Sequence, residues 1–303
     1  GTEEVSNGNF SQEGSELVTN GSFDTDSDWN IVNNTGTASE IINGYARIKT
    51  DGAYTQIDQP NVTIAAKSYK LQYTISESDG GSLGFIITGN QTASIPTTVG
   101  THIYYFVANS TSIVFKRFSG VLDVKIDNVS VKEVGQDWSL ETGWSIGDGS
   151  LVANSVTTGL AFQSNIVEAN KSYKATYSVV VTSGSVGLYF DGGTGYQGVV
   201  TTTQTITVFF KATTTSPLYF RSNTSNFTGS ITNISVKEVG QDWTFGTGWS
   251  MEDRAFYNDS APGSYTHLTL PTTAAAEISV CLVSLKKNKP RRNQRRSVEK
   301  DIK

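Results

Sequence analysis

The sequence predicts an all-β protein built from tandem antiparallel β-sandwich modules. The first observation behind this prediction is a long repeat, because residues 129–138 read VSVKEVGQDW and residues 234–243 read ISVKEVGQDW. The second is that apolar and polar residues alternate through short stretches, which is the period of a half-buried strand, without any helical period. The third is an abundance of turn residues, including 29 Gly. Together these observations indicate an array of similar jelly-roll-like modules.

The chain opens with a short motif that occurs twice. Residues 3–10 read EEVSNGNF, and residues 16–23 read ELVTNGSF. Because one strand cannot bury its own apolar side chains, we interpret residues 1–15 as the stub of a preceding module. The chain begins Gly-Thr and its only methionine is Met251, so we expect a fragment of a longer protein.

The long repeat divides the rest of the chain. We predict a first β-sandwich module at residues 16–134, a second at residues 135–239 and the truncated start of a third at residues 240–263. Gly135 and Gly240 supply the turn that leads from one module to the next. Almost no linker remains between the modules, so they should lie directly against each other.

Both modules contain a strand that begins Lys-Ser-Tyr-Lys, and its alternation places one face in the core. The residues on that face are Tyr69, Leu71, Tyr73 and Ile75 in the first module and Tyr173, Ala175, Tyr177 and Val179 in the second. Near the start of the modules we match Trp138 with Phe23 and Trp144 with Trp29. All these side chains are expected to be buried.

The order of the motifs resembles a known family. An opening LVTNGSF (residues 17–23), a Trp after a short acidic turn, a central KSYKLQYTIS (residues 67–76) and a closing KIDNVSVKEV (residues 125–134) look like the cellulase-associated carbohydrate-binding modules of the family 4/9 type. Those modules are jelly rolls related to galactose-binding-like domains, so the resemblance implies that fold and a carbohydrate-binding role. The repeated joint is also similar to tandem modules in phage tail or adhesin proteins.

The resemblance further implies a structural Ca²⁺ in the first module. In the resembled modules the ion lies where the opening strand meets the closing strand, and Asp24 and Asp127 match those positions. Hard oxygen ligands suit such a site. The counterparts in the second module are Ser139 and Thr232, so both acids are absent there. The alternative is that Asp24 and Asp127 belong to an ordinary turn and a solvated strand end.

Strand alternation also predicts aromatic residues on the outer surface of the second module. If their apolar neighbours point inward, Tyr189, Phe209 and Tyr219 point outward with Arg221, whereas the first module offers only Tyr104 at the matching places. Sugar rings stack on exposed aromatic rings, so we predict that the second module binds the ligand. The alternative is that these rings pack on a neighbouring module or turn inward at a bulge.

The sequence offers little for catalysis. His102 stands alone before a predicted strand, whereas His267 and the only cysteine, Cys281, lie near the C-terminus, so no Ser-His-Asp, Cys-His or His-rich metal pattern is assembled. An acid pair such as Asp24 and Asp127 fits a metal site or solvated turns better than a glycosidase pair. We therefore predict that the protein is not an enzyme.

The C-terminal part differs from everything before it. Residues 264–272, SYTHLTLPT, resemble a translated sequencing adapter, and we interpret residues 264–303 as a non-native or disordered tail. The alternative for its basic run, residues 286–296, is a nuclear-localisation or RNA-binding tail. Residues 1–263 hold 14 Lys and Arg against 25 Asp and Glu, and no apolar run reaches membrane-spanning length. We therefore expect neither nucleic acid nor a membrane as a partner.

These observations favour a non-catalytic carbohydrate-binding or adhesion array within a larger secreted, extracellular or virion protein. Its expected partners are glycans or cell-surface polysaccharide, with homo-oligomers formed through the parent protein. Two alternatives remain open. The modules are structural spacers of a tail or surface protein, or they are an ancillary region of a glycoside hydrolase.

Overall fold

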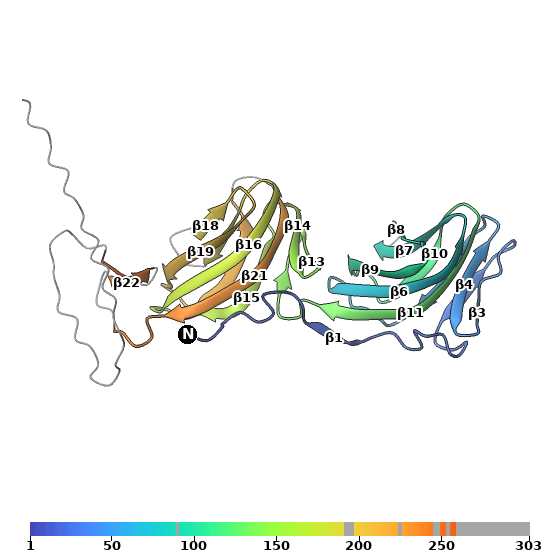
Figure 1. Cartoon of the computed structure of the whole chain (residues 1–303), viewed down its shortest axis with the longest axis horizontal. Coiled ribbons are helices and arrows are strands. Elements are labelled where there is room, and N and C mark those ends of the chain that lie inside the picture. The colour runs from blue at the N-terminus through green and yellow to red at the C-terminus, as the bar shows by residue number, and fades with distance from the viewer. Residues whose placement is uncertain (89–90, 191–196, 224–225, 245–248, 253–254, 259–303) are drawn as a thin grey trace, which may run out of the picture. The chain divides into compact units, whose positions relative to one another are not determined.

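The computed structural model describes residues 1–88, 91–190, 197–223, 226–244, 249–252 and 255–258 (Figure 1). These residues form strands and turns, and the paired strands run antiparallel. The part of the chain that the structure describes contains no helix that is long and apolar enough to cross a membrane. The all-β antiparallel class predicted from the sequence is confirmed.

The first sandwich is built from two sheets. The strand order is β3-β4-β11-β6-β9 in one sheet, with β1 also paired to β11, and β2-β5-β10-β7-β8 in the other. The bounds are β1 (Glu13–Glu16), β2 (Asn30–Asn33), β3 (Glu40–Ile42), β4 (Tyr45–Thr50), β5 (Thr55–Gln59), β6 (Ser68–Asp79), β7 (Ser82–Thr88), β8 (Gln91–Ile95), β9 (Gly100–Val107), β10 (Ile113–Ser119) and β11 (Leu122–Val134).

The second sandwich repeats this plan. Its sheets have the orders β13-β14-β21-β16-β19 and β12-β15-β20-β17-β18, so each strand from β12 to β21 has a counterpart among β2 to β11. The bounds are β12 (Ser139–Leu140), β13 (Trp144–Gly147), β14 (Ser150–Val156), β15 (Leu160–Val167), β16 (Ser172–Ser183), β17 (Val186–Phe190), β18 (Gln197–Val200), β19 (Gln204–Lys211), β20 (Ser216–Ser222) and β21 (Phe227–Val239). In Figure 1 the longest strands, β6 with β11 and β16 with β21, run side by side.

Each sandwich has its own hydrophobic core between its two sheets. The eight residues that the Lys-Ser-Tyr-Lys strands were predicted to bury are between 0% and 2% exposed. The buried tyrosine hydroxyls are hydrogen bonded, since Tyr73 donates to the Pro96 carbonyl at 2.9 Å and Tyr177 donates to the Gly198 carbonyl at 2.7 Å. A buried hydroxyl without a partner would destabilise the fold, so these bonds explain why tyrosine is accepted in the core.

The joint between the sandwiches is a glycine turn. Gly135 has φ 71° and Gly240 has φ 73°, a conformation that favours glycine. At both places the amide of the Trp three residues later donates to the glycine carbonyl, from Trp138 at 2.9 Å and from Trp243 at 3.0 Å. The repeated GQDW sequence thus folds into the same turn twice.

Residues 1–15 differ from our interpretation of them as a stub of a preceding module. Residues 3–10 lie along β21 of the second sandwich, with Val5 and Phe10 buried in its core at 6% and 3% exposure. Accordingly, the N-terminus is found beside β21 in Figure 1. A segment that cannot bury its apolar side chains alone is therefore buried against a sandwich that lies further along the chain.

The segment also changes which aromatic residues correspond. Phe10 contacts Trp138 with ring centroids 5.3 Å apart, and Phe23 contacts Trp29 at 5.1 Å, each pair tilted by 42°. Phe10 is therefore the counterpart of Phe23, and Trp138 is the counterpart of Trp29. Our matching of Trp138 with Phe23 was wrong because the opening segment of the second sandwich does not immediately precede it in the sequence.

After the second sandwich, β22 (Trp249–Glu252) and β23 (Ala255–Asn258) pair as a hairpin. The hairpin falls within residues 240–263, which we predicted as the start of a third module. The interpretation of residues 264–303 as a non-native tail concerns residues outside the described part of the chain.

Candidate functional site

Three aromatic side chains form a row across the sheet that contains β12, β15, β20, β17 and β18. Phe162 on β15 is directly opposite Tyr219 on β20, and Tyr219 is directly opposite Tyr189 on β17. Their ring centroids are 5.5 Å apart between Phe162 and Tyr219 and 6.2 Å apart between Tyr219 and Tyr189. We call these three residues the aromatic row. Such cross-strand neighbours support one another, which holds the rings in place.

The alternation of the strands explains why the aromatic row faces outward. On β20, Leu218 and Phe220 are 0% exposed and lie in the core, so Tyr219 between them points to the other side of the sheet. The three rings of the row are half-buried, because their neighbours cover part of each ring. A partly covered, outward-facing ring still offers part of its apolar surface to solvent.

Arg221 lies next to the aromatic row. Its guanidinium carbon is 5.8 Å from the centroid of the Tyr189 ring, within cation–π range. The Arg221 Nε is buried and has no hydrogen-bond partner among the residues that the structure describes. Arg221 is opposite Gly187 on β17 and Leu160 on β15.

Phe162 was missing from the predicted set, because its neighbours in the sequence do not mark it as outward. On β15, Ala161 and Gln163 are buried at 0% and 4% exposure, and Phe162 between them is half-buried. A small Ala and a polar Gln take the inward positions, so apolar alternation in the sequence does not show which way Phe162 faces. The sequence also does not predict the register between β15 and β20, which places Phe162 beside Tyr219.

The first sandwich has no equivalent row. The core residues Phe115 and Phe85 are opposite each other, as Phe220 and Leu188 are in the second sandwich. Val114 therefore corresponds to Tyr219, and its neighbours Asp58 and Ile86 correspond to Phe162 and Tyr189. None of the three is aromatic. The two sandwiches thus share a fold but differ in this surface, which singles out the second.

Phe209 does not join the aromatic row. It lies on β19, in the other sheet of the second sandwich, and is opposite Lys174, whose ammonium is 5.9 Å from its ring centroid. Its neighbours Val208 and Phe210 pack against the core, so Phe209 faces outward, as alternation predicted. It faces the opposite side of the sandwich from Tyr219, and the predicted set is therefore split between two surfaces.

The prediction that Tyr104 is an outward residue was wrong. Tyr104 packs against the core of the first sandwich, 6.3 Å from the Phe85 ring, and burial raises its pKa. Tyr69 is opposite Phe106 and Tyr173 is opposite Phe210, so the counterpart of Phe209 is Tyr105. A shift of one residue in a strand reverses the face, and two adjacent tyrosines concealed that shift. Tyr105 itself packs against the core cluster of the second sandwich.

Of the two acids matched to a Ca²⁺ site, Asp24 lies in the bend between β1 and β2, and Asp127 lies within β11. Asp24 is exposed and accepts a hydrogen bond from the Ser22 hydroxyl at 2.7 Å. Asp127 accepts from the Asn128 amide at 2.6 Å and from its side chain at 3.0 Å. The described residues contain no group of three or more His, Cys, Asp or Glu side chains arranged to hold a metal, so backbone and hydroxyl oxygens would have to complete the site.

The second sandwich shows what Asp127 replaces. Thr74 is opposite Asp127 and Ser178 is opposite Thr232, so Thr232 is the counterpart of Asp127. The Thr232 hydroxyl donates to the Gly149 carbonyl at 2.9 Å, whereas an ionised carboxylate cannot donate. The counterpart of Asp24 is Ser11, not Ser139, because residues 3–10 match residues 16–23. The first sandwich therefore has two carboxylates where the second has hydroxyl groups.

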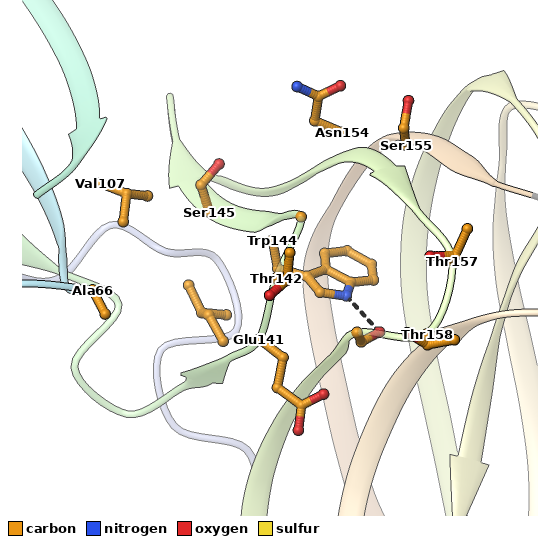
Figure 2. A pocket seen from close by; sticks show the side chains of 13 residues that line it. Ala66, Val107, Glu141, Thr142, Trp144, Ser145, Asn154, Ser155, Thr157 and Thr158 are labelled. Atoms are coloured by element: carbon orange, nitrogen blue, oxygen red, sulfur yellow. Dashed lines mark hydrogen bonds between the residues drawn. The ribbon is translucent and has the colours of Figure 1, made fainter. Parts of the chain in front are cut away.

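A hollow of about 840 Å³ surrounds Trp144 (Figure 2). Trp144 is 4% exposed, and its indole nitrogen donates to the Gly159 carbonyl at 3.0 Å, the dashed line in Figure 2. Figure 2 places Glu141 and Thr158 on the same side of the hollow as this bond. Because the indole ring is buried and its only donor is used, the hollow lacks the exposed aromatic surface that the aromatic row provides.

The fold and the surface define a tandem β-sandwich protein whose second sandwich carries an outward aromatic row. No protein-family model matches the sequence, and no curated protein matches it. The structure is similar to the N-terminal CBM22-1–CBM22-2 tandem domain of Xyn10C from Paenibacillus barcinonensis, with 10% identity and a TM-score of 0.33, covering 76% of this chain and 99% of that one. A second match, the secreted serine protease VesC from Vibrio cholerae, has 8% identity and a TM-score of 0.26, covering 67% of this chain and 51% of that one.

Proposed function

We propose that the second sandwich binds carbohydrate on the aromatic row, without catalysis. The observation that carries the proposal is the register that places Phe162, Tyr219 and Tyr189 on three adjacent strands with their rings facing outward. The C–H face of a sugar ring packs on an aromatic ring, and a row of rings offers successive contacts to a glycan chain. The preferred ligand is therefore an extended glycan.

Arg221 supplies the polar contact that stacking alone lacks. Its guanidinium lies beside Tyr189 and has an unpaired Nε donor among the described residues. A guanidinium donates hydrogen bonds to sugar hydroxyl groups and pairs in a bidentate manner with carboxylates. Arg221 thus orients a glycan and favours one that carries acidic sugars.

A glycan array probed with the purified chain tests the proposal. We expect Tyr219→Ala to weaken binding about fivefold, since it removes the central ring of the row and each stacked ring contributes on the order of 1 kcal/mol. Phe209→Ala is the matched control, because it removes an outward ring from the opposite sheet and should leave binding unchanged. Both variants should melt close to the wild type.

Two results would count against carbohydrate binding. One is an array without any bound glycan, which would favour the spacer interpretation, in which the sandwiches position other parts of a longer protein. The other is a Tyr219→Ala variant that binds as well as the wild type while Phe209→Ala does not. A secreted or virion location and an ancillary role beside a hydrolase remain predictions.

We also propose a structural Ca²⁺ in the first sandwich, held by Asp24 and Asp127. The support is that Thr232, the counterpart of Asp127, donates a hydrogen bond that a carboxylate cannot make. An ion that binds only the folded state stabilises it by about 2.7 kcal/mol at a hundred times its Kd. Calcium should therefore raise the melting temperature of the first sandwich, as measured by calorimetry with and without a chelator.

Asp127→Thr, which installs the residue of the second sandwich, should remove the calcium dependence, whereas Asp26→Asn in the same acidic turn should keep it. A wild-type melting temperature that calcium does not change would contradict the calcium proposal. It would leave the carbohydrate proposal intact, because the aromatic row lies on the other sandwich.

A further inference from the structure

The two opening segments, residues 3–10 and residues 16–23, make the same contacts with different sandwiches. The Glu3 carboxylate accepts from the Val236 amide at 2.7 Å and from the Ser235 hydroxyl at 2.6 Å. The Glu16 carboxylate accepts from the Val131 amide at 2.9 Å and from the Ser130 hydroxyl. Since VSVKEV and ISVKEV are the repeated closing strands, each segment recognises the same repeated sequence.

The backbone contacts also correspond pair by pair. The Glu4 amide donates to the Val236 carbonyl at 2.9 Å, as the Leu17 amide does to the Val131 carbonyl at 3.0 Å. A buried glutamine side chain holds each segment through two hydrogen bonds. The Gln163 side chain accepts from the Ser6 amide at 3.1 Å and donates to the Ser6 carbonyl at 2.6 Å. Gln59 does the same with Thr19 at 2.9 Å and 2.7 Å.

Packing against the sandwich requires the glycine and the phenylalanine of each segment. A Cβ added to Gly8 would lie 1.9 Å from the Ile234 carbonyl oxygen, and one added to Gly21 would lie 2.0 Å from the Val129 carbonyl oxygen. Phe10 and Phe23 enter the cores at 3% and 1% exposure. The shared pattern Glu-x-Val-x-Asn-Gly-x-Phe is therefore what the docking site requires.

The route of the chain is different for the two segments. Residues 16–23 complete the sandwich that follows at once, whereas residues 3–10 complete one that begins only at Trp138, beyond the whole first sandwich. Two residues, Ser11 and Gln12, connect Phe10 to β1, which belongs to the first sandwich. The opening segment of the second sandwich is thus joined to the rest of the chain by a short hinge. This arrangement is typical of segments that are exchanged between subunits.

We propose that this docking site on the second sandwich accepts the Glu-x-Val-x-Asn-Gly-x-Phe segment of a second copy of the chain. Exchange between copies conserves every contact described above, and short hinges favour such swapping. The segment docks along β21 through backbone hydrogen bonds and an isolated bridge between Glu3 and Lys237, with Phe10 as an aromatic anchor in the core. The occupant is thus an identical segment supplied by another molecule.

A Gly8→Ala variant of the full chain tests the exchange. The added methyl group clashes with Ile234 and displaces the chain's own segment, while the docking site keeps its sequence. A labelled peptide of residues 2–12 should bind this variant, measured by fluorescence polarisation, at least about tenfold more tightly than it binds the wild type, whose own segment competes intramolecularly. The same peptide with Gly8→Ala is the matched control and should not bind.

If the Gly8→Ala chain leaves its second sandwich unfolded, the peptide should restore the missing unfolding transition when it is present during refolding. A peptide that neither binds nor restores the transition would overturn the proposal. For the exchange itself, wild-type chains refolded together at high concentration should contain dimers by light scattering, and Gly8→Ala chains should not. A wild type that stays monomeric after such refolding would also overturn it.

Discussion

Gly135 occupies a place where any side chain larger than a hydrogen atom is rejected. Its φ is 71°, and a Cβ would lie 2.5 Å from Cγ1 of Ile146. Gly135→Ala should therefore destabilise the second sandwich by about 1–2 kcal/mol from the backbone conformation alone, plus the cost of moving Ile146. Thermal unfolding followed by circular dichroism measures this loss.

The matched control is Gly240→Ala, in the same turn of the second repeat, with φ 73°. It carries the same backbone cost at the end of the second sandwich. If the two variants lower the melting temperature equally, the shared backbone conformation explains both glycines without a further cost from Ile146.

Single residues also show where sequence reasoning reached and where it stopped. Alternation placed Tyr189, Tyr219 and Phe209 on outward faces, because a strand has only two sides. It misplaced Tyr104, where two adjacent tyrosines hid a shift of one position, and it could not show that Phe162 and Tyr219 are neighbours. Facing is a local property of a strand, whereas neighbourhood depends on the register between strands that lie far apart in the sequence.

Among the elements, β4 and β11 of the first sandwich are linked by an ion pair that the second sandwich lacks. Asp123 accepts two hydrogen bonds from Arg47, at 2.7 Å and 2.6 Å. These bonds and the Arg47 charge hold the pKa of the Asp123 carboxyl below its usual value. The equivalent residues of the second sandwich, Val152 and Thr228, carry no charge.

The lowered pKa makes the first sandwich sensitive to acid. The stabilisation is complete above the pKa of an unfolded Asp, about 3.9, and is lost as the pH falls through the lower pKa of the folded state. Asp123→Asn should therefore lower the melting temperature at pH 7, by the equivalent of about 1 kcal/mol, and flatten its fall below pH 4. Melting curves between pH 2 and pH 7 measure both effects.

Asp26→Asn, at an exposed position of the same sandwich, should leave the acid limb of that curve unchanged. An Asp123→Asn variant with the same acid limb as the wild type would show that the ion pair does not set the acid sensitivity.

At the scale of elements, the strand order within each sandwich follows from a repeated sequence, and the repeat was visible. The sequence did not show that residues 3–10 are the opening segment of the second sandwich. Two copies of the opening motif precede two copies of the closing strand, but that count does not show which copy pairs with which. The pairing is decided by burial of Phe10 beside Trp138, and these two residues are separated in the sequence by the whole first sandwich.

For the whole molecule, the docked segment means that residues 3–23 contribute to both sandwiches. Phe10→Ala removes a ring that is 3% exposed, and large-to-small changes of this kind cost about 3–5 kcal/mol. We expect calorimetry to show that Phe10→Ala lowers the unfolding temperature of the second sandwich and leaves that of the first unchanged.

Phe23→Ala is the matched variant, and it should lower the transition of the first sandwich instead. A single transition that shifts equally in both variants would mean that the two sandwiches unfold as one cooperative unit. In that case calorimetry would not separate the contribution of Phe10 to the second core from that of Phe23 to the first.

The docking of residues 3–10 also has a consequence for the order of events on the ribosome. These residues leave the exit tunnel well before β21, which receives them and is made more than two hundred residues later. At about 5–20 residues per second, the segment waits on the order of 10–50 s with Val5 and Phe10 exposed, while the first sandwich is already complete. During that interval, neighbouring nascent chains on the same messenger RNA carry the same exposed segment. The rate of translation therefore influences how often the segments of two chains are exchanged.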